Sequence, residues 1–180
     1  MPNMDAIDRY VSEPLLEGEA AHEFRRGHEK VAARHRTWRE NFPAIGLLLD
    51  TDEDRAQALA GNYATEARET VEVWLEVFDA GPSHDVDVED RVQWIEGLWD
   101  AWREWVFESE DFGRLAEGPR RRFLTVFDDL CGRFRVDAVA SVRAGGGPLA
   151  AGPSLTDRLS APIRAIGRAV QGFFFPSVKD

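Results

Sequence analysis

The stretch VEDRVQWIEGLWDAWREWV, residues 88–106, decides the fold of this chain and contains four of its six tryptophans. Its large apolar side chains recur at alternating spacings of four and three residues, which is the period of one face of an α-helix. A second apolar row beside the first widens the buried face to about half of the helix circumference. The two rows are Val88, Val92, Ile95, Trp99, Trp102 and Val106, and Trp94, Leu98, Ala101 and Trp105. We therefore predict a central helix that packs against neighbouring helices on two sides.

Helical periodicity also predicts a short N-terminal helix, interrupted near Pro14, and three longer helices besides the central one. Their approximate ranges are 4–16, 17–41, 50–78 and 118–142. A buried connector is predicted at 45–49, with the apolar residues Ile45, Leu47, Leu48 and Leu49. No stretch alternates between apolar and polar residues with period two, so no β-strand is expected. The predicted fold is an all-α, single-domain bundle of five or six helices over residues 1–143.

A Gly/Pro-rich linker, AGGGPLAAGP at residues 144–153, tethers a C-terminal segment, residues 154–180, which is predicted to form an amphipathic helix. At a helical period the large apolar residues of that segment share an arc of about 100°, which we call the apolar stripe. The stripe consists of Leu155 and of six residues that we assign as partner- or surface-binding: Leu159, Ile163, Ile166, Val170, Phe173 and Phe174. Three covers for the stripe stay open: the bundle itself, a groove on a partner or a second copy, and a membrane or granule surface.

The composition predicts a folded cytoplasmic domain. The chain has 180 residues, of which 43% are hydrophobic, and no apolar run approaches the roughly 18–20 residues that span a bilayer. The N-terminus lacks the basic and apolar regions of a secretory signal, and the single cysteine, Cys131, excludes an intrachain disulfide. A net charge of −11 opposes binding of phosphates by the whole surface, so a nucleic-acid partner is not expected.

Two histidines are candidate cofactor-binding residues because they share the apolar seam of the helix predicted over 17–41. His28 and His35 alternate there with large apolar side chains, so both are predicted to point into the bundle. A neutral imidazole in a core can bind a metal ion or haem, or act as a pH switch. The two are about 10 Å apart along the helix axis, which is too far to share one metal ion. The alternative is a pair of partly buried histidines that are hydrogen-bonded to acids across a helix interface.

Acidic residues form a ridge along the helix predicted over 50–78. The ridge consists of Glu66, Glu69, Glu72 and Glu76. Such a ridge can hold Mg²⁺, but its position beside the core stripe favours a solvated surface. The basic residues concentrated in 25–39 are expected to pair with the acidic segments 50–54 and 85–90. Glu19-Ala-Ala-His22 matches the Glu-x-x-His element of di-iron bundles, but the chain lacks the second element that such a site needs.

No catalytic residue, metal site or cofactor is assigned from the sequence. The chain has no nucleophile elbow and no phosphate-cradling glycine loop, and Cys131 is interpreted as a buried, inert thiol. We therefore expect a non-enzymatic helical interaction module (an adaptor, chaperone-like, regulatory or assembly subunit) whose partner is another protein or a second copy. One alternative is a sensory or binding domain that holds haem, a metal or an apolar ligand beside His28 or His35. The other is a peripheral protein of a membrane or granule surface.

Overall fold

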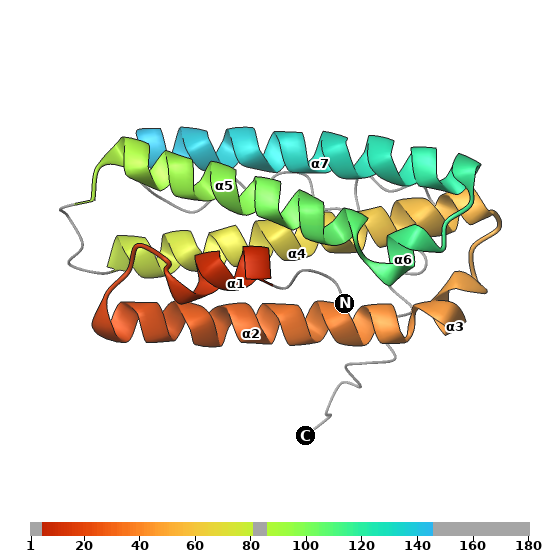
Figure 1. Cartoon of the computed structure of the whole chain (residues 1–180), viewed down its shortest axis with the longest axis horizontal. Coiled ribbons are helices and arrows are strands. Elements are labelled where there is room, and N and C mark those ends of the chain that lie inside the picture. Colours follow the sequence, from red (N-terminus) through yellow and green to blue (C-terminus); the bar gives the residue numbers. More distant parts are fainter. Residues whose placement is uncertain (1–4, 81–85, 146–180) are drawn as a thin grey trace, which may run out of the picture.

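The computed structural model describes residues 5–80 and 86–145, and every regular element within these ranges is a helix (Figure 1). The elements are α1 (Asp5–Ser12), α2 (Gly18–Glu40), α3 (Phe42–Gly46), α4 (Asp52–Ala80), α5 (Val88–Phe107), α6 (Glu110–Gly113) and α7 (Glu117–Arg143). The predicted all-α bundle is confirmed. Five of these helices correspond to the predicted ones, and the short helices α3 and α6 lie in the connections between them.

The predicted binding residues of the C-terminal segment, 154–180, lie outside the described residues. They are Leu159, Ile163, Ile166, Val170, Phe173 and Phe174. The linker is described only as far as Gly145. The assignment of the apolar stripe as a binding face therefore stays a prediction.

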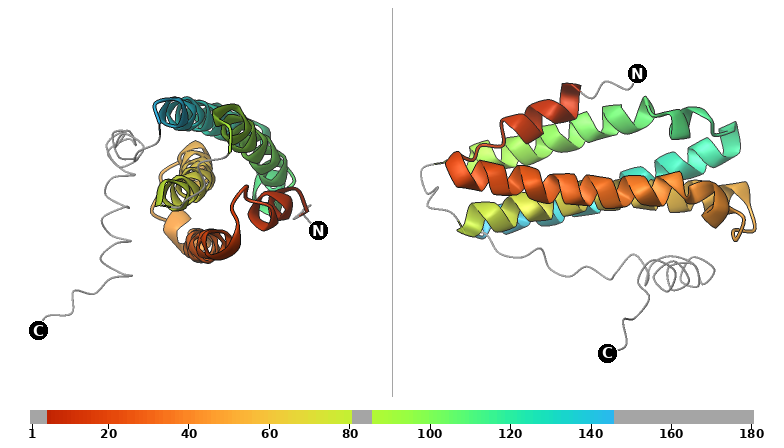
Figure 2. Two further views of the ribbon diagram at one scale, coloured as in Figure 1. Left: turned by 90° about the vertical axis from the view of Figure 1, so that its left-hand side faces the viewer. Right: turned by 90° about the horizontal axis from the view of Figure 1, so that it is seen from below.

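The four long helices α2, α4, α5 and α7 run along the length of the molecule around a common core (Figures 1 and 2). α4 contacts α2, α5 and α7, and α5 packs on both α7 and α1. The short helix α1 contacts α2 and α5 at the end of the bundle where α7 finishes (Figure 1). The Trp-rich helix α5 is thus covered on two sides, as predicted.

Polar caps set where the two core helices begin. The Thr51 hydroxyl accepts a hydrogen bond from the Asp54 amide at 3.1 Å before α4, and the Asp87 side chain accepts one from the Glu89 amide at 3.3 Å before α5. Both helices carry acidic residues in their first turns, where the helix dipole stabilises negative charge. The caps and the acidic first turns thus favour helix starts at these positions.

Aromatic side chains build the core at the end where α1 lies. The indoles of Trp74 and Trp94 are stacked with ring centroids 4.6 Å apart, and Phe24 from α2 packs edge-on against Trp94. α1 joins this core through Tyr10, which lies across α5 at Gly97. A β-carbon at position 97 would be 2.2 Å from the Tyr10 hydroxyl. The missing side chain at Gly97 therefore lets α1 lie against α5.

The connector between α2 and α4 is only half buried, which corrects the prediction for residues 45–49. Ile45 and Leu49 belong to the core, whereas Leu47 and Leu48 are 80% and 62% exposed. α3 continues as a tight turn in which the amides of residues 47, 48 and 49 donate to carbonyls three residues earlier. Side chains three or four residues apart share one side of such a turn, so Ile45 and Leu49 point inward and the two leucines between them point outward.

Candidate functional site

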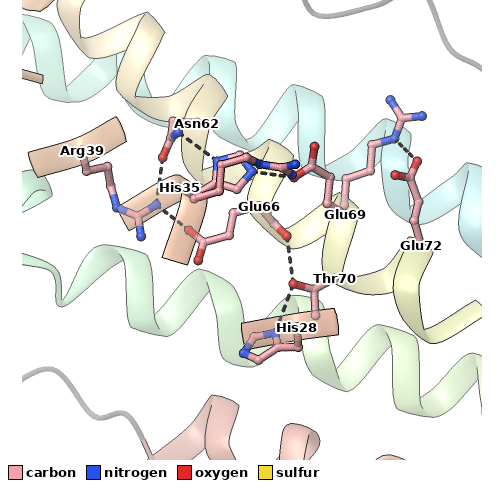
Figure 3. A network of polar contacts seen from close by, with 10 residues as sticks. His28, His35, Arg39, Asn62, Glu66, Glu69, Thr70 and Glu72 are labelled. Atoms are coloured by element: carbon pink, nitrogen blue, oxygen red, sulfur yellow. Dashed lines mark hydrogen bonds and ion pairs between the residues drawn. The ribbon is translucent and has the colours of Figure 1, made fainter. Parts of the chain in front are cut away.

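The two predicted histidines lie in a network of polar side chains between α2 and α4 (Figure 3). His35 is buried and His28 is half-buried, so both face the bundle as the helical spacing predicted. The other members of the network are Arg34 and Arg39 on α2, and Asn62, Glu66, Glu69 and Thr70 on α4. Whether His28 and His35 can bind a cofactor depends on which of their ring nitrogens this network leaves available.

The hydrogen bonds of His35 are consistent with one neutral form of its ring. Because a guanidinium can only donate, the Asn62 carbonyl oxygen accepts from Arg39 at 2.8 Å. The Asn62 amide nitrogen then donates to His35 Nδ1 at 2.9 Å, which leaves His35 Nε2–H to donate to Glu69 at 2.6 Å. Both ring nitrogens of His35 are therefore engaged within the protein, and a haem or metal ligand would have to break one of these bonds.

Glu66 and Arg39 form an ion pair inside the α2–α4 interface. Glu66 is 2% exposed, and the Arg39 guanidinium also lies over the Tyr63 ring, 4.3 Å from its centroid. Burial raises the pKa of Glu66, although the charge and hydrogen bond of Arg39 act to lower it. Removing one partner would leave the other charge buried without compensation. The pair therefore fastens α2 to α4.

Glu69 accepts hydrogen bonds from two side chains of α2, those of Arg34 and His35. Partial burial acts to raise the pKa of Glu69, but the hydrogen bonds and charges of His35 and Arg34 outweigh it, so the pKa lies below its usual value. Histidine hydrogen-bonded to an acid across a helix interface is the alternative that the sequence left open, and for His35 the structure shows it.

These contacts correct two predictions about charged residues. The acidic ridge is not a solvated surface, because Glu66 and Glu69 face α2 and only Glu76 at its end is exposed. Arg34 and Arg39 pair with this ridge rather than with the acidic segments 50–54 and 85–90. The reason is geometric: α2 and α4 pack along their lengths, so the polar flank of one helix faces the polar flank of the other.

His28 differs from His35 because the described residues supply a hydrogen-bond partner for only one of its ring nitrogens. The Thr70 hydroxyl donates to the Glu66 carbonyl at 3.0 Å, so its oxygen accepts from His28 Nδ1–H at 3.3 Å. No hydrogen bond to Nε2 comes from residues 5–80 or 86–145. Burial lowers the pKa of His28, although the nearby charges of Asp8 and Glu29 act to raise it. His28 is thus held in the uncharged state beside the edge of Trp102.

The other candidate ligands do not assemble into a metal centre. Within the described ranges, no group of three or more His, Cys, Asp or Glu side chains is placed to hold a metal ion. Glu19 and His22 of the Glu-x-x-His element are both exposed. Cys131 is partly buried, and burial raises the pKa of its thiol, which disfavours the reactive thiolate.

A second region, which sequence reasoning missed, is the turn between α1 and α2. The buried Pro14 accepts a hydrogen bond through its carbonyl from Trp74 Nε1 at 2.6 Å, and the carbonyl of Glu13 accepts one from Trp94 Nε1 at 3.3 Å. The two stacked indoles thus hold two consecutive carbonyls of the turn. Leu15 follows with a φ of 56°, in the left-handed region where a residue with a β-carbon is strained.

Leu15 borders a cavity of about 940 Å³ at this end of the bundle. The apolar residues around the cavity are Tyr10, Pro14, Leu15, Leu16, Ala20, Val86 and Trp94. The charged residues around it are Arg9, Glu13, Glu17 and Glu19. Leu15 is 40% exposed, so an apolar side chain is displayed there from a strained backbone. The cavity thus has an apolar wall, and most of the charged residues that line it are acidic.

The sequence carried only a weak signal for this cavity. Pro14 indicated an interruption, and Leu15-Leu16 after it placed two apolar residues next to the break. The two residues before Leu15 bond to indoles that lie far along the chain, Trp74 at 60 residues from Pro14 and Trp94 at 81 residues from Glu13. No local pattern in residues 13–17 reports those partners.

Comparison with protein families, curated proteins and solved structures finds no match for this chain. No helix within residues 5–80 and 86–145 is both long and apolar enough to cross a lipid bilayer.

Proposed function

We propose that this protein is a non-enzymatic helical interaction module that binds an apolar, basic helical segment in the cavity beside the α1–α2 turn. The observation that carries the proposal is Leu15, whose side chain borders the cavity while its backbone is strained. A left-handed residue with a β-carbon costs about 1–2 kcal/mol, and glycine adopts the same conformation without that cost. Strained residues of this kind cluster at binding sites, where the strain holds a side chain in its working position.

The turn that carries Leu15 is hydrogen-bonded to the aromatic core. Trp74 and Trp94 are buried, stacked on each other and hydrogen-bonded to the two residues that precede Leu15. A site that is already ordered loses little conformational entropy on binding, so more of the contact energy appears as affinity. The stacked indoles therefore support a preformed site at this turn.

The surroundings of the cavity indicate the chemistry of the ligand. Each large apolar side chain that becomes buried there contributes roughly 1.5–3 kcal/mol before ordering costs. Glu13, Glu17 and Glu19 outnumber Arg9 around the opening and favour a ligand that carries positive charge. An amphipathic helix supplies both features, because it places apolar residues on one side and basic residues beside them.

The polar network between α2 and α4 supports a structural role rather than catalysis. His35, Glu66 and Glu69 are bonded to side chains of the facing helix. These are the residue types that act as general acids and bases in enzymes. Here their hydrogen-bonding groups are occupied by one another, and they hold the two helices together.

A second candidate function follows from the size of the cavity. Its volume of about 940 Å³ falls in the range of small-molecule sites. An apolar small molecule is therefore the alternative ligand, and comparing an apolar fluorophore with the peptide discriminates between the two.

The proposed function is tested by titrating the full chain into a low, fixed concentration of a fluorescent synthetic amphipathic peptide of leucine and arginine, with binding read by anisotropy. Leu15→Asn removes the apolar side chain, and asparagine tolerates the left-handed conformation. We expect it to weaken binding by about tenfold or more, which corresponds to the loss of about 1.4 kcal/mol. Leu48→Asn is the matched control, because it makes the same change at an exposed leucine at the opposite end of the bundle.

Three results would contradict the proposal. They are that the peptide fails to bind, that Leu15→Asn leaves the peptide affinity unchanged, or that Leu48→Asn weakens this affinity as much as Leu15→Asn does. An apolar fluorophore that binds in a Leu15-dependent way, while the peptide does not, would favour the small-molecule alternative.

A further inference from the structure

We infer that the segment that occupies this cavity is the chain's own C-terminal segment, residues 154–180, bound in cis through its apolar stripe. The inference rests on the proposed function, because it names the ligand of the same cavity. The site would then be occupied by the protein's own tail. A partner would then have to compete with the tail for the site.

The place where the chain leaves the bundle supports binding in cis. Arg143, the last residue of α7, pairs with Glu89 in the first turn of α5 at 3.8 Å. Val86, three residues before Glu89, borders the cavity. The end of α7 and the α1–α2 turn lie at the same end of the bundle (Figure 2, left). α7 contacts α5, and α5 contacts α1. Two interhelical spacings of about 8–10 Å, about 20 Å in total, therefore separate α7 from α1.

The linker is long enough for this crossing. Ten residues lead from Gly145 to Leu155, the first residue of the apolar stripe. An extended chain of that length spans at most about 33–36 Å, which exceeds the width of the bundle end. The exposed Leu47 and Leu48 lie at the opposite end, beyond the length of α7, which is about 40 Å. Leu155 can therefore reach the cavity but not that second exposed apolar patch.

The chemistry of the tail matches the chemistry of the cavity. The seven large apolar residues of the stripe are worth roughly 1.5–3 kcal/mol each when buried, so the stripe requires a cover. Residues 146–180 contain four basic side chains and two acidic ones, in a chain that is strongly acidic as a whole. Arg158, Arg164 and Arg168 fall outside the stripe at a helical period, where they can meet Glu17 and Glu19.

Attachment to the same chain also favours the tail over a second copy. A short flexible linker holds its segment at an effective concentration on the order of millimolar. A second copy competes only at its bulk concentration, which is far lower for a dilute protein. Binding in cis is therefore the state expected of the isolated chain.

The test compares two phenylalanines of the tail in the full chain. At a helical period Phe173 lies in the apolar stripe and Phe175 lies on the opposite side. Phe173→Asp should release the tail, so the synthetic leucine/arginine peptide should bind about tenfold or more tightly once its competitor is gone. Phe175→Asp is the matched control and should leave the affinity unchanged. Ile166→Asp provides a second stripe variant with the expected behaviour of Phe173→Asp.

A second readout reports on the cavity directly. The first amides of α2, residues 18–20, have no acceptor within the helix and exchange quickly with solvent unless something covers them. Hydrogen–deuterium exchange of these amides should be faster in Phe173→Asp than in Phe175→Asp. The difference should not depend on protein concentration.

Each failure identifies what is wrong. If the peptide binds through Leu15 but Phe173→Asp and Ile166→Asp change nothing, the tail does not occupy the cavity, while the proposed function stands. If protection of residues 18–20 rises with protein concentration, the occupant is a second copy and binding in cis is wrong. If the peptide binds neither the full chain nor the stripe variants, the proposed function fails together with this inference.

Discussion

Between α2 and α4, His35, Glu66 and Glu69 bond to side chains of the facing helix, whereas at the α1–α2 turn two indoles bond to backbone carbonyls beside a cavity. The first region contains the residue types that suggest chemistry, and the packing of two helices occupies them. The second region has an apolar wall, and it borders open space. The groups that hold the bundle together therefore lie in one region, and the surface that the bundle offers to a ligand lies in another.

The largest expected effect comes from breaking the ion pair of the first region. Arg39→Met should lower the free energy of unfolding by about 3–5 kcal/mol, because Glu66 is left buried without its cation. The double variant Arg39→Met/Glu66→Leu should recover most of that loss, since neither charge is then buried. Urea unfolding measures both, with the exposed Arg26→Met as the control. A loss below 1 kcal/mol for Arg39→Met would show that the network does not fasten α2 to α4.

The next largest effect concerns the indoles that hold the turn. Trp74→Phe removes the N–H that bonds to the Pro14 carbonyl and leaves space in a fully buried position. We expect a loss of about 2–3 kcal/mol in the free energy of unfolding. Trp38→Phe, at a half-buried tryptophan on α2, should cost less. If the two variants lose the same free energy of unfolding, the hydrogen bond of Trp74 to the turn adds nothing to stability.

A smaller effect of opposite sign is expected at Leu15. Leu15→Gly relieves the left-handed strain, partly offset by the greater freedom of glycine in the unfolded chain, so it should stabilise the fold by about 0.5–1 kcal/mol. The same variant should lose peptide binding. Thermal unfolding and anisotropy measure the two effects, and Leu48→Gly should show no stabilisation. If Leu15→Gly destabilises the protein, Leu15 contributes to the core rather than to binding.

The smallest expected effect is a change in pH dependence at the edge of the polar network. Burial lowers the pKa of His28, so below its ordinary value near 6.5 the unfolded chain takes up a proton first, and the free energy of unfolding falls as the pH falls. His28→Asn keeps a donor toward Thr70 and should remove this part of the decrease. Urea unfolding at pH 7.5 and pH 5.5 checks it. The exposed His22→Asn serves as the control, and it should leave the slope unchanged.

The helical periodicity of apolar residues was enough to predict the bundle. The spacing of tryptophans in α5 and of the histidines in α2 predicted which faces turn inward, and the structure confirms both. What the sequence did not reveal depends on pairings between distant helices. Glu66 was interpreted as a surface residue because its partner Arg39 comes from another helix. Leu15 resembled an ordinary apolar residue because its conformation is set by tryptophans of α4 and α5.

The close approach of Tyr10 to Gly97 has a consequence for the shape of the cavity. One wall of the cavity belongs to α1, and α1 rests on α5 at a position where even a methyl group would collide with the phenol ring. A larger residue at this glycine would have to push aside the Tyr10 ring, which lines the cavity, while the residues of the turn stayed in place. The shape of the cavity therefore depends on a residue of α5 that does not line it.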